Sequence, residues 1–159
     1  MKIIAIDPGY ERLGIAILEK VDHKSQETLL FSECFKTSSQ LPHSKRLVLI
    51  GNHLKLLIEK IKPEALSIET LFFNTNQKTA MYVAEARGTI MYICANAGLS
   101  MEEFTPLQIK VAVTGYGRGD KSGISKMVPL LIKLPKKVIS DDEYDAIAVG
   151  LTYFAHHRI

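Results

Sequence analysis

Two acidic residues stand at the ends of short apolar segments, where side chains that do chemistry are often held. Asp7 ends the segment KIIAID and is followed at once by a Pro-Gly turn signal. Glu69 ends a second segment, ALSIE. In an open α/β sheet, functional groups gather beyond the carboxyl ends of the strands. If both segments are parallel neighbouring strands, the two carboxylates lie side by side, which is costly without a cation.

A third acidic group lies near the C-terminus, in the sequence SDDEYD that ends at Asp145. Ser140 and Glu143 have the spacing of a capping box, which predicts the start of a helix. Acidic residues in a first helical turn are stabilised by the helix dipole, and this alone accounts for Asp141, Asp142 and Glu143. It does not account for Asp145, which lies in the second turn and leads into the apolar stretch AIAVGL.

Asp142 and Asp145 are three residues apart, so they share one face of the predicted helix. If this helix packs beside the two acid-ending strands, Asp145 joins Asp7 and Glu69. Carboxylate oxygens are the ligands that Mg²⁺ and Mn²⁺ prefer. Two such ions about 3.5 to 4 Å apart would clamp a phosphate for in-line displacement. The acids therefore indicate a metal-dependent site for phosphoryl transfer.

The elements that must position these acids form a mixed α/β pattern. Three strand-like segments joined by short turns predict an antiparallel meander, and the later strands are separated by helical segments, as in parallel crossovers. We expect an α/β fold with a five-stranded mixed sheet, its first three strands antiparallel, flanked by α-helices in a single domain, 1–159. The expected strands are 2–7, 13–21, 27–37, 65–69 and 101–105, and the expected helices are 44–60, 76–97, 106–113, 121–134 and 140–155.

The composition is that of an ordinary folded protein with a mildly basic charge. The formal net charge is +3, which permits binding to nucleic acid but does not establish it. Cys34 and Cys94 both lie in apolar stretches, so we expect two buried free thiols. No apolar run is long enough for a membrane span and no secretion signal pattern is visible, so a cytoplasmic protein without a membrane partner is expected.

Several motifs occur together in an order that resembles one known family. They are IDPG around Asp7 with Gly14 after it, IETLFF around Glu69, EARG at 85–88 and DEYDAIAVG at 142–150. Over nearly its whole length the chain resembles the RuvC family of Holliday-junction resolvases, in the ribonuclease H-like superfamily. The resemblance implies a ribonuclease H-like fold.

The resemblance also implies a function and a set of ligands. It implies that Asp7, Glu69, Asp142 and Asp145 are catalytic and hold Mg²⁺, with two ions per site and with Mn²⁺ as a substitute. It implies a homodimer that binds four-way junction DNA in recombination and repair and makes paired symmetric nicks, leaving 5′-phosphate and 3′-hydroxyl ends. Implied partners are a junction-binding protein and a branch-migration motor (RuvA and RuvB type).

Candidate DNA contacts are two aromatic residues beyond Glu69 and four cations. The aromatic rings can stack on unpaired bases, although packing in the core is the alternative, and it is favoured for Phe73. Lys110 and Lys121 match family lysines near the scissile phosphate, and a solvated surface cation is the alternative for every Lys and Arg. The full set is Phe72, Phe73, Arg87, Lys110, Arg118 and Lys121.

Three small residues, Ala80, Ala84 and Gly88, fall four apart on one face of the expected helix 76–97. This ridge would suit either a two-fold dimer contact or packing within its own domain. Other functions also stay open: a ribonuclease H-like nuclease that acts on RNA–DNA hybrids or at a single site, and a junction-binding module without catalysis. An actin-like nucleotide-binding domain is disfavoured, because the chain lacks a second lobe and phosphate loops.

Overall fold

The computed structural model describes residues 1–22, 24–71, 77–117, 122–136 and 139–157. Strands and helices follow one another within these ranges as the sequence predicts, with ends that differ by at most three residues. In chain order they are β1 (Lys2–Asp7), β2 (Arg12–Glu19), β3 (Thr28–Lys36), α1 (His43–Ile61), β4 (Ala65–Glu69), α2 (Gln77–Asn96), β5 (Ser100–Phe104), α3 (Pro106–Thr114), α4 (Ser122–Leu131) and α5 (Asp141–His156).

The strands form one mixed sheet in the order β3-β2-β1-β4-β5. The pairs β1–β2 and β2–β3 are antiparallel, whereas β1–β4 and β4–β5 are parallel. This arrangement confirms the predicted meander followed by crossovers. The carboxyl ends of β1, β4 and β5 therefore lie at the same edge of the sheet, which we call the carboxyl edge.

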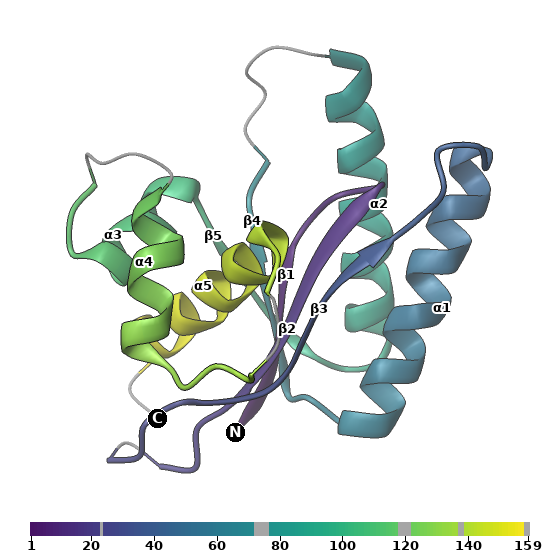
Figure 1. Cartoon of the computed structure of the whole chain (residues 1–159). Helices are drawn as coiled ribbons and strands as arrows, with labels where there is room; N and C mark the ends of the chain where they lie inside the picture. The colour runs from purple at the N-terminus through teal and green to yellow at the C-terminus, as the bar shows by residue number, and fades with distance from the viewer. Residues whose placement is uncertain (23, 72–76, 118–121, 137–138, 158–159) are drawn as a thin grey trace.

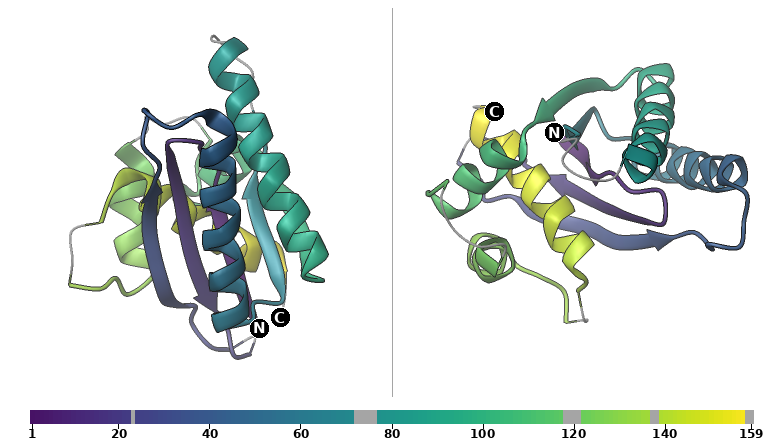
Figure 2. Two further views of the ribbon diagram at one scale, coloured as in Figure 1. Left: turned by 90° about the vertical axis from the view of Figure 1, so that its right-hand side faces the viewer. Right: turned by 90° about the horizontal axis from the view of Figure 1, so that it is seen from above.

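Helices cover both faces of the sheet (Figure 1). Helices α1 and α2 lie on one face, and α3, α4 and α5 lie on the other, as the two rotated views in Figure 2 also show. Successive residues of β1 alternate between the two cores: Ile4 and Ile6 pack with α1 and α2, while Ile3 and Ala5 pack with the α5 side. Burial on both faces explains why this strand is an unbroken apolar run.

A glycine lets helix α5 pack directly against the sheet. A Cβ atom on Gly150 would come 2.5 Å from Cδ1 of Leu18 in β2, so no larger residue fits without movement. At the neighbouring residue of the helix, the Ser67 hydroxyl of β4 donates a hydrogen bond of 3.0 Å to the carbonyl oxygen of Val149. These contacts fix the long axis of α5 against β1, β2 and β4.

Two expectations about local features need correction. Cys94 is buried, and burial raises the pKa of its thiol to about 12, but Cys34 is only partly buried because it lies on the edge strand β3. Helix α4 ends at Leu131 rather than at Leu134. Leu134 precedes Pro135, and the residue before a proline is disfavoured in helical conformation. Among the described helices, none combines the length and apolar character needed to cross a bilayer.

Candidate active site

Asp7 and Glu69 are the last residues of two neighbouring parallel strands. In the β1–β4 register Ile6 pairs with Ile68, so the next residue on each strand reaches the carboxyl edge at the same level. Both carboxylate side chains are partly exposed, unlike the fully buried residues just before them. The juxtaposition predicted for the two strand ends is therefore present.

A cavity of about 740 Å³ lies at this edge, and Asp7 and Glu69 line it together with Asp145 of α5. We call it the acidic pocket. It brings these three predicted acids together with Lys110, which was predicted from the resemblance as a DNA contact. The remaining wall comes from α3, α4 and α5, through Pro106, Ile109, Ile124, Ser125, Asp141 and Tyr144.

Asp142 is not among the residues that line the acidic pocket, although the sequence predicted it there. Its neighbour Asp141 lines the pocket instead. Successive residues of an α-helix point about 100° apart, so the two side chains cannot face the same way. The Asp142 carboxylate is directed to Arg12 of β2, whose Nε donates a hydrogen bond of 2.9 Å to Oδ2 and whose Nη2 also pairs with that oxygen.

The surroundings of Asp142 favour its ionised form. Burial opposes ionisation, but hydrogen bonds from Arg12 and Cys34 and the guanidinium charge outweigh it and lower the pKa of Asp142. In the part of the chain that the structure describes, no three His, Cys, Asp or Glu side chains form a group ready to hold a metal ion. The acidic side chains of the described residues therefore line one pocket, but they are not arranged as a ready-made metal-binding site.

Gly14 lets the start of α5 approach β1. Gly14 pairs with Asp7 in the sheet register, and a Cβ atom on it would come 2.1 Å from the carbonyl oxygen of Asp142 and 3.1 Å from Cβ of Asp7. A side chain at this position would push the helix away from the strand. The glycine that follows the IDPG motif is therefore required for the close approach of the two elements.

The first turn of α5 is fixed by a capping box, as the sequence predicted. Ser140 accepts a hydrogen bond from the backbone N–H of Glu143, and the Glu143 side chain accepts one from the backbone N–H of Ser140. Glu143 is also buried, and it accepts a hydrogen bond of 2.7 Å from the Ser32 hydroxyl of β3. No sequence pattern indicates this contact between residues so far apart along the chain. Glu143 thus anchors the helix end that presents the acids.

Comparison with known proteins decides the family. Residues 3–153 match the profile of the family described as "Crossover junction endodeoxyribonuclease RuvC". The chain belongs to the RuvC family. The RuvC-family enzyme of Ruminiclostridium cellulolyticum is 38% identical over 159 residues, covering 100% of this chain and 95% of that protein. The one from Thermosipho melanesiensis is 43% identical over 150 residues, covering 94% of each.

Solved structures of other proteins show the same fold. The structure described as T. thermophilus RuvC in complex with Holliday junction substrate has a TM-score of 0.90 and 29% identity, covering 99% of this chain and 95% of that one. The yeast mitochondrial Holliday junction resolvase Ydc2 has a TM-score of 0.72 at 10% identity, covering 96% of this chain and 77% of that one, and supports the fold alone.

Arg87, a predicted DNA contact, has two partners within the protein. Its Nε donates a hydrogen bond of 3.1 Å to the carbonyl oxygen of Glu69, and its guanidinium also pairs with Glu103 of β5. The side chain is 15% exposed, so it is largely engaged in holding α2 against the ends of β4 and β5. The structure gives Arg87 a positioning role for Glu69, and a contact with DNA stays a prediction.

The other predicted site residues are the ridge of small residues on α2 and four candidate DNA contacts. Ala80 and Ala84 are partly buried on α2 and Gly88 is exposed. Described contacts of α2 with α1 include the stacking of Tyr82 on His43 and the approach of Ile93 to Gly51. The dimer role of this ridge therefore stays a prediction. The remaining four predicted residues lie outside the described ranges: Phe72, Phe73, Arg118 and Lys121.

Proposed function

We propose that this RuvC-family chain is a crossover junction endodeoxyribonuclease that resolves four-way DNA junctions. The observation that carries the proposal is the acidic pocket, where Asp7 and Glu69 from parallel strand ends meet Asp145 from α5 and a lysine. The relative from T. thermophilus was solved with a Holliday junction substrate and has nearly the same backbone fold. A hydrolytic nuclease of this family acts in DNA recombination and repair.

The chemistry of the pocket fits a hard divalent cation. Its described acids offer only carboxylate oxygens, which suit Mg²⁺ and Mn²⁺ and suit softer metals poorly. Asp7, Glu69 and Asp145 would hold the ions, two per site in the ribonuclease H-like arrangement, with Asp142 as a further ligand once its carboxylate turns toward the pocket. When bound, the ions supply Lewis-acid stabilisation of the attacking and leaving oxygens.

The chain itself positions the DNA phosphate. Lys110 is partly buried in the wall of the pocket, where an ammonium group stabilises the negative charge that develops on the phosphate. Ile109, Ile124 and Tyr144 form an apolar side of the same cavity, which limits bulk water near the reacting bond. As the family resemblance implies, hydrolysis would leave a 5′-phosphate and a 3′-hydroxyl end.

Symmetric cleavage requires two sites related by a two-fold axis, as in the junction itself. We infer a homodimer, with Ala80, Ala84 and Gly88 of α2 at the contact between the copies. The exposed side chains of Met81 and Tyr92 on the same helix support an interface there, because large apolar side chains at a surface favour burial. Partners of the RuvA and RuvB type would deliver the junction to this dimer.

One experiment tests the proposal directly. The purified chain is mixed with Mg²⁺ and a labelled four-way junction, a linear duplex or an RNA–DNA hybrid. We expect paired, symmetric nicks in the junction alone, and binding without cleavage for Asp7→Asn. Glu64→Gln, at the opposite edge of the sheet, is the matched control and should cleave normally. Cleavage of the hybrid or the linear duplex at the same rate would contradict the proposal in favour of another ribonuclease H-like activity.

A further inference from the structure

The ion pair between Arg12 and Asp142 lies beside the acidic pocket and joins two elements of the site. Arg12 is the first residue of β2, and Asp142 is in the first turn of α5. The Asp142 side chain is 19% exposed, whereas that of Arg12 is 52% exposed. One partner is thus held within the protein and the other remains open to solvent.

The pair sets the direction of the Asp142 carboxylate. Two nitrogen atoms of Arg12 contact the same oxygen, Oδ2, and Cys34 on β3 supplies a further hydrogen bond. All these partners belong to β2 and β3, on the side away from β4. With its carboxylate held there, Asp142 is absent from the lining of the pocket that contains its neighbours Asp141 and Asp145.

Arg12 also lies beside a residue of the same charge. In the β2–β3 register Arg12 pairs with Lys36, and directly opposed residues in an antiparallel pair point to the same face. Like charges in this position repel, and Asp142 offsets that repulsion in the free protein. The same two cations form a place where an anion would be attracted, and the anion that reaches a nuclease site is a DNA phosphate.

A cation in the pocket and the Arg12 guanidinium compete for the same carboxylate. Arginine binds phosphate oxygens through paired N–H donors as well as it binds carboxylates, so a phosphate can replace Asp142 as its partner. Because half of the Arg12 side chain is exposed, the exchange needs no unfolding of β2.

We propose that Arg12 is a positioning residue that holds Asp142 out of the acidic pocket in the free protein and releases it when the guanidinium moves to a DNA phosphate. DNA binding would then complete the metal site. This inference rests on the proposed function, since it takes Asp142 as a metal ligand and DNA as the substrate.

The first test measures Mn²⁺ binding without DNA, by the electron paramagnetic resonance signal of free Mn²⁺. Arg12→Gln should bind Mn²⁺ roughly two- to five-fold more tightly than the unchanged chain, the range expected for removing one exposed competing charge. Arg12→Lys keeps the charge and should stay close to the unchanged chain. In an Asp142→Asn background, Arg12→Gln should have no effect. Unchanged or weaker Mn²⁺ binding by Arg12→Gln would overturn the proposal.

The second test measures binding of a four-way junction in EDTA at several salt concentrations. Arg12→Gln should bind more weakly, and its salt dependence should fall by about one phosphate contact. An unchanged salt dependence would overturn the release to phosphate. Asp7→Asn is the control for the proposed function: if it binds Mn²⁺ as well as the unchanged chain, the metal site itself is wrong, whatever Arg12 does.

Discussion

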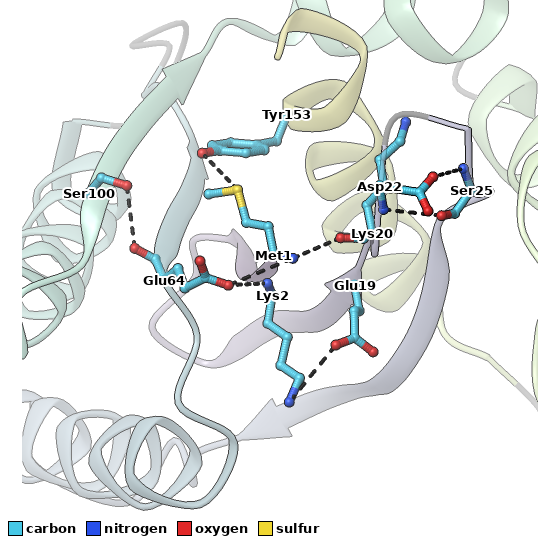
Figure 3. Close-up of polar contacts among 9 residues, drawn as sticks. All are labelled: Met1, Lys2, Glu19, Lys20, Asp22, Ser25, Glu64, Ser100 and Tyr153. Atoms are coloured by element: carbon cyan, nitrogen blue, oxygen red, sulfur yellow. Dashed lines mark hydrogen bonds and ion pairs between the residues drawn. The ribbon is translucent and has the colours of Figure 1, made fainter. Parts of the chain in front are cut away.

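The two edges of the sheet differ in how their charged groups are paired. At the amino end of β1, the terminal amine of Met1 and the side chain of Lys2 lie beside acceptors (Figure 3). The terminal amine donates a hydrogen bond of 2.8 Å to the carbonyl oxygen of Lys20, and Glu64 accepts one of 2.8 Å from the backbone N–H of Lys2. The Lys2 ammonium also lies 4.0 Å from the Glu19 carboxylate. Opposite charges alternate there, which favours folding.

At the carboxyl edge, acidic side chains predominate instead. Asp7, Glu69, Asp141 and Asp145 line a single pocket with Lys110. Close carboxylates repel one another and make their joint ionisation costly. A bound cation would offset this repulsion. The comparison therefore separates charged groups that stabilise the fold from the acidic groups that we propose for catalysis.

The largest expected loss of junction cleavage is for a substitution of an acidic residue in the pocket. Asp145→Asn should lower the rate of junction cleavage by roughly 100-fold or more, the scale seen when a group that stabilises transition-state charge is lost. The same change should leave the fold intact, because Asn has nearly the same size and shape as Asp. Single-turnover cleavage and a melting curve on the same sample measure both. Normal cleavage by this variant would remove Asp145 from the metal site.

The next largest expected effect is a loss of stability when the contact between α5 and β1 is disturbed. Gly14→Ala should destabilise the protein by about 1–3 kcal/mol, because its Cβ atom meets the backbone of Asp142 rather than a side chain that can move. Gly88→Ala is the matched control: no described atom lies within 4 Å of its added Cβ, so the helix should gain about 0.5–1 kcal/mol. Denaturant unfolding of both variants measures the difference. Equal stabilities would show that Gly14 is not needed for the close approach.

A smaller effect is expected for the residue that supports Glu69. Arg87→Met should lower cleavage by roughly 10-fold, because the end of β4 loses its hydrogen bond and the Glu69 carboxylate, proposed as a metal ligand, moves slightly. If Arg87 instead binds DNA, the loss should appear as weaker junction binding with a reduced salt dependence. Rates at saturating junction concentration and binding curves in EDTA distinguish the two roles.

The smallest effect is expected at the opposite edge. Glu64→Gln weakens an exposed ion pair with the terminal amine, which lies at 3.8 Å, and should cost at most about 1 kcal/mol of stability. Its junction cleavage should equal that of the unchanged chain. A large loss of cleavage here would break the distinction between the two edges.

Local patterns were sufficient to predict the positions of Asp7 and Glu69. Each ends a strand buried on both faces, and the order of strands and helices places those strands in parallel contact. The direction of Asp142 was not predictable in this way. It depends on Arg12, which is 130 positions away in the chain, and nothing in the sequence near either residue indicates the pair.

The contacts of Arg87 could not be predicted from the sequence for the same reason. The EARG motif indicated an important arginine, but the hydrogen bond to the Glu69 carbonyl depends on how α2 packs beside β4 and β5. Helix packing of this kind is set by side chains from several elements at once, so short sequence motifs cannot specify it. The acid positions follow from topology, whereas the partners of those acids follow from packing.

The stability gained from Mg²⁺ tests the central claim most directly. A ligand that binds only the folded state raises the unfolding temperature, so Mg²⁺ should stabilise the unchanged chain and Glu64→Gln equally. Asp7→Asn and Asp145→Asn should show little or no Mg²⁺-dependent rise. Equal stabilisation of all four proteins would place the cation elsewhere and contradict the assignment of the acidic pocket as the metal site.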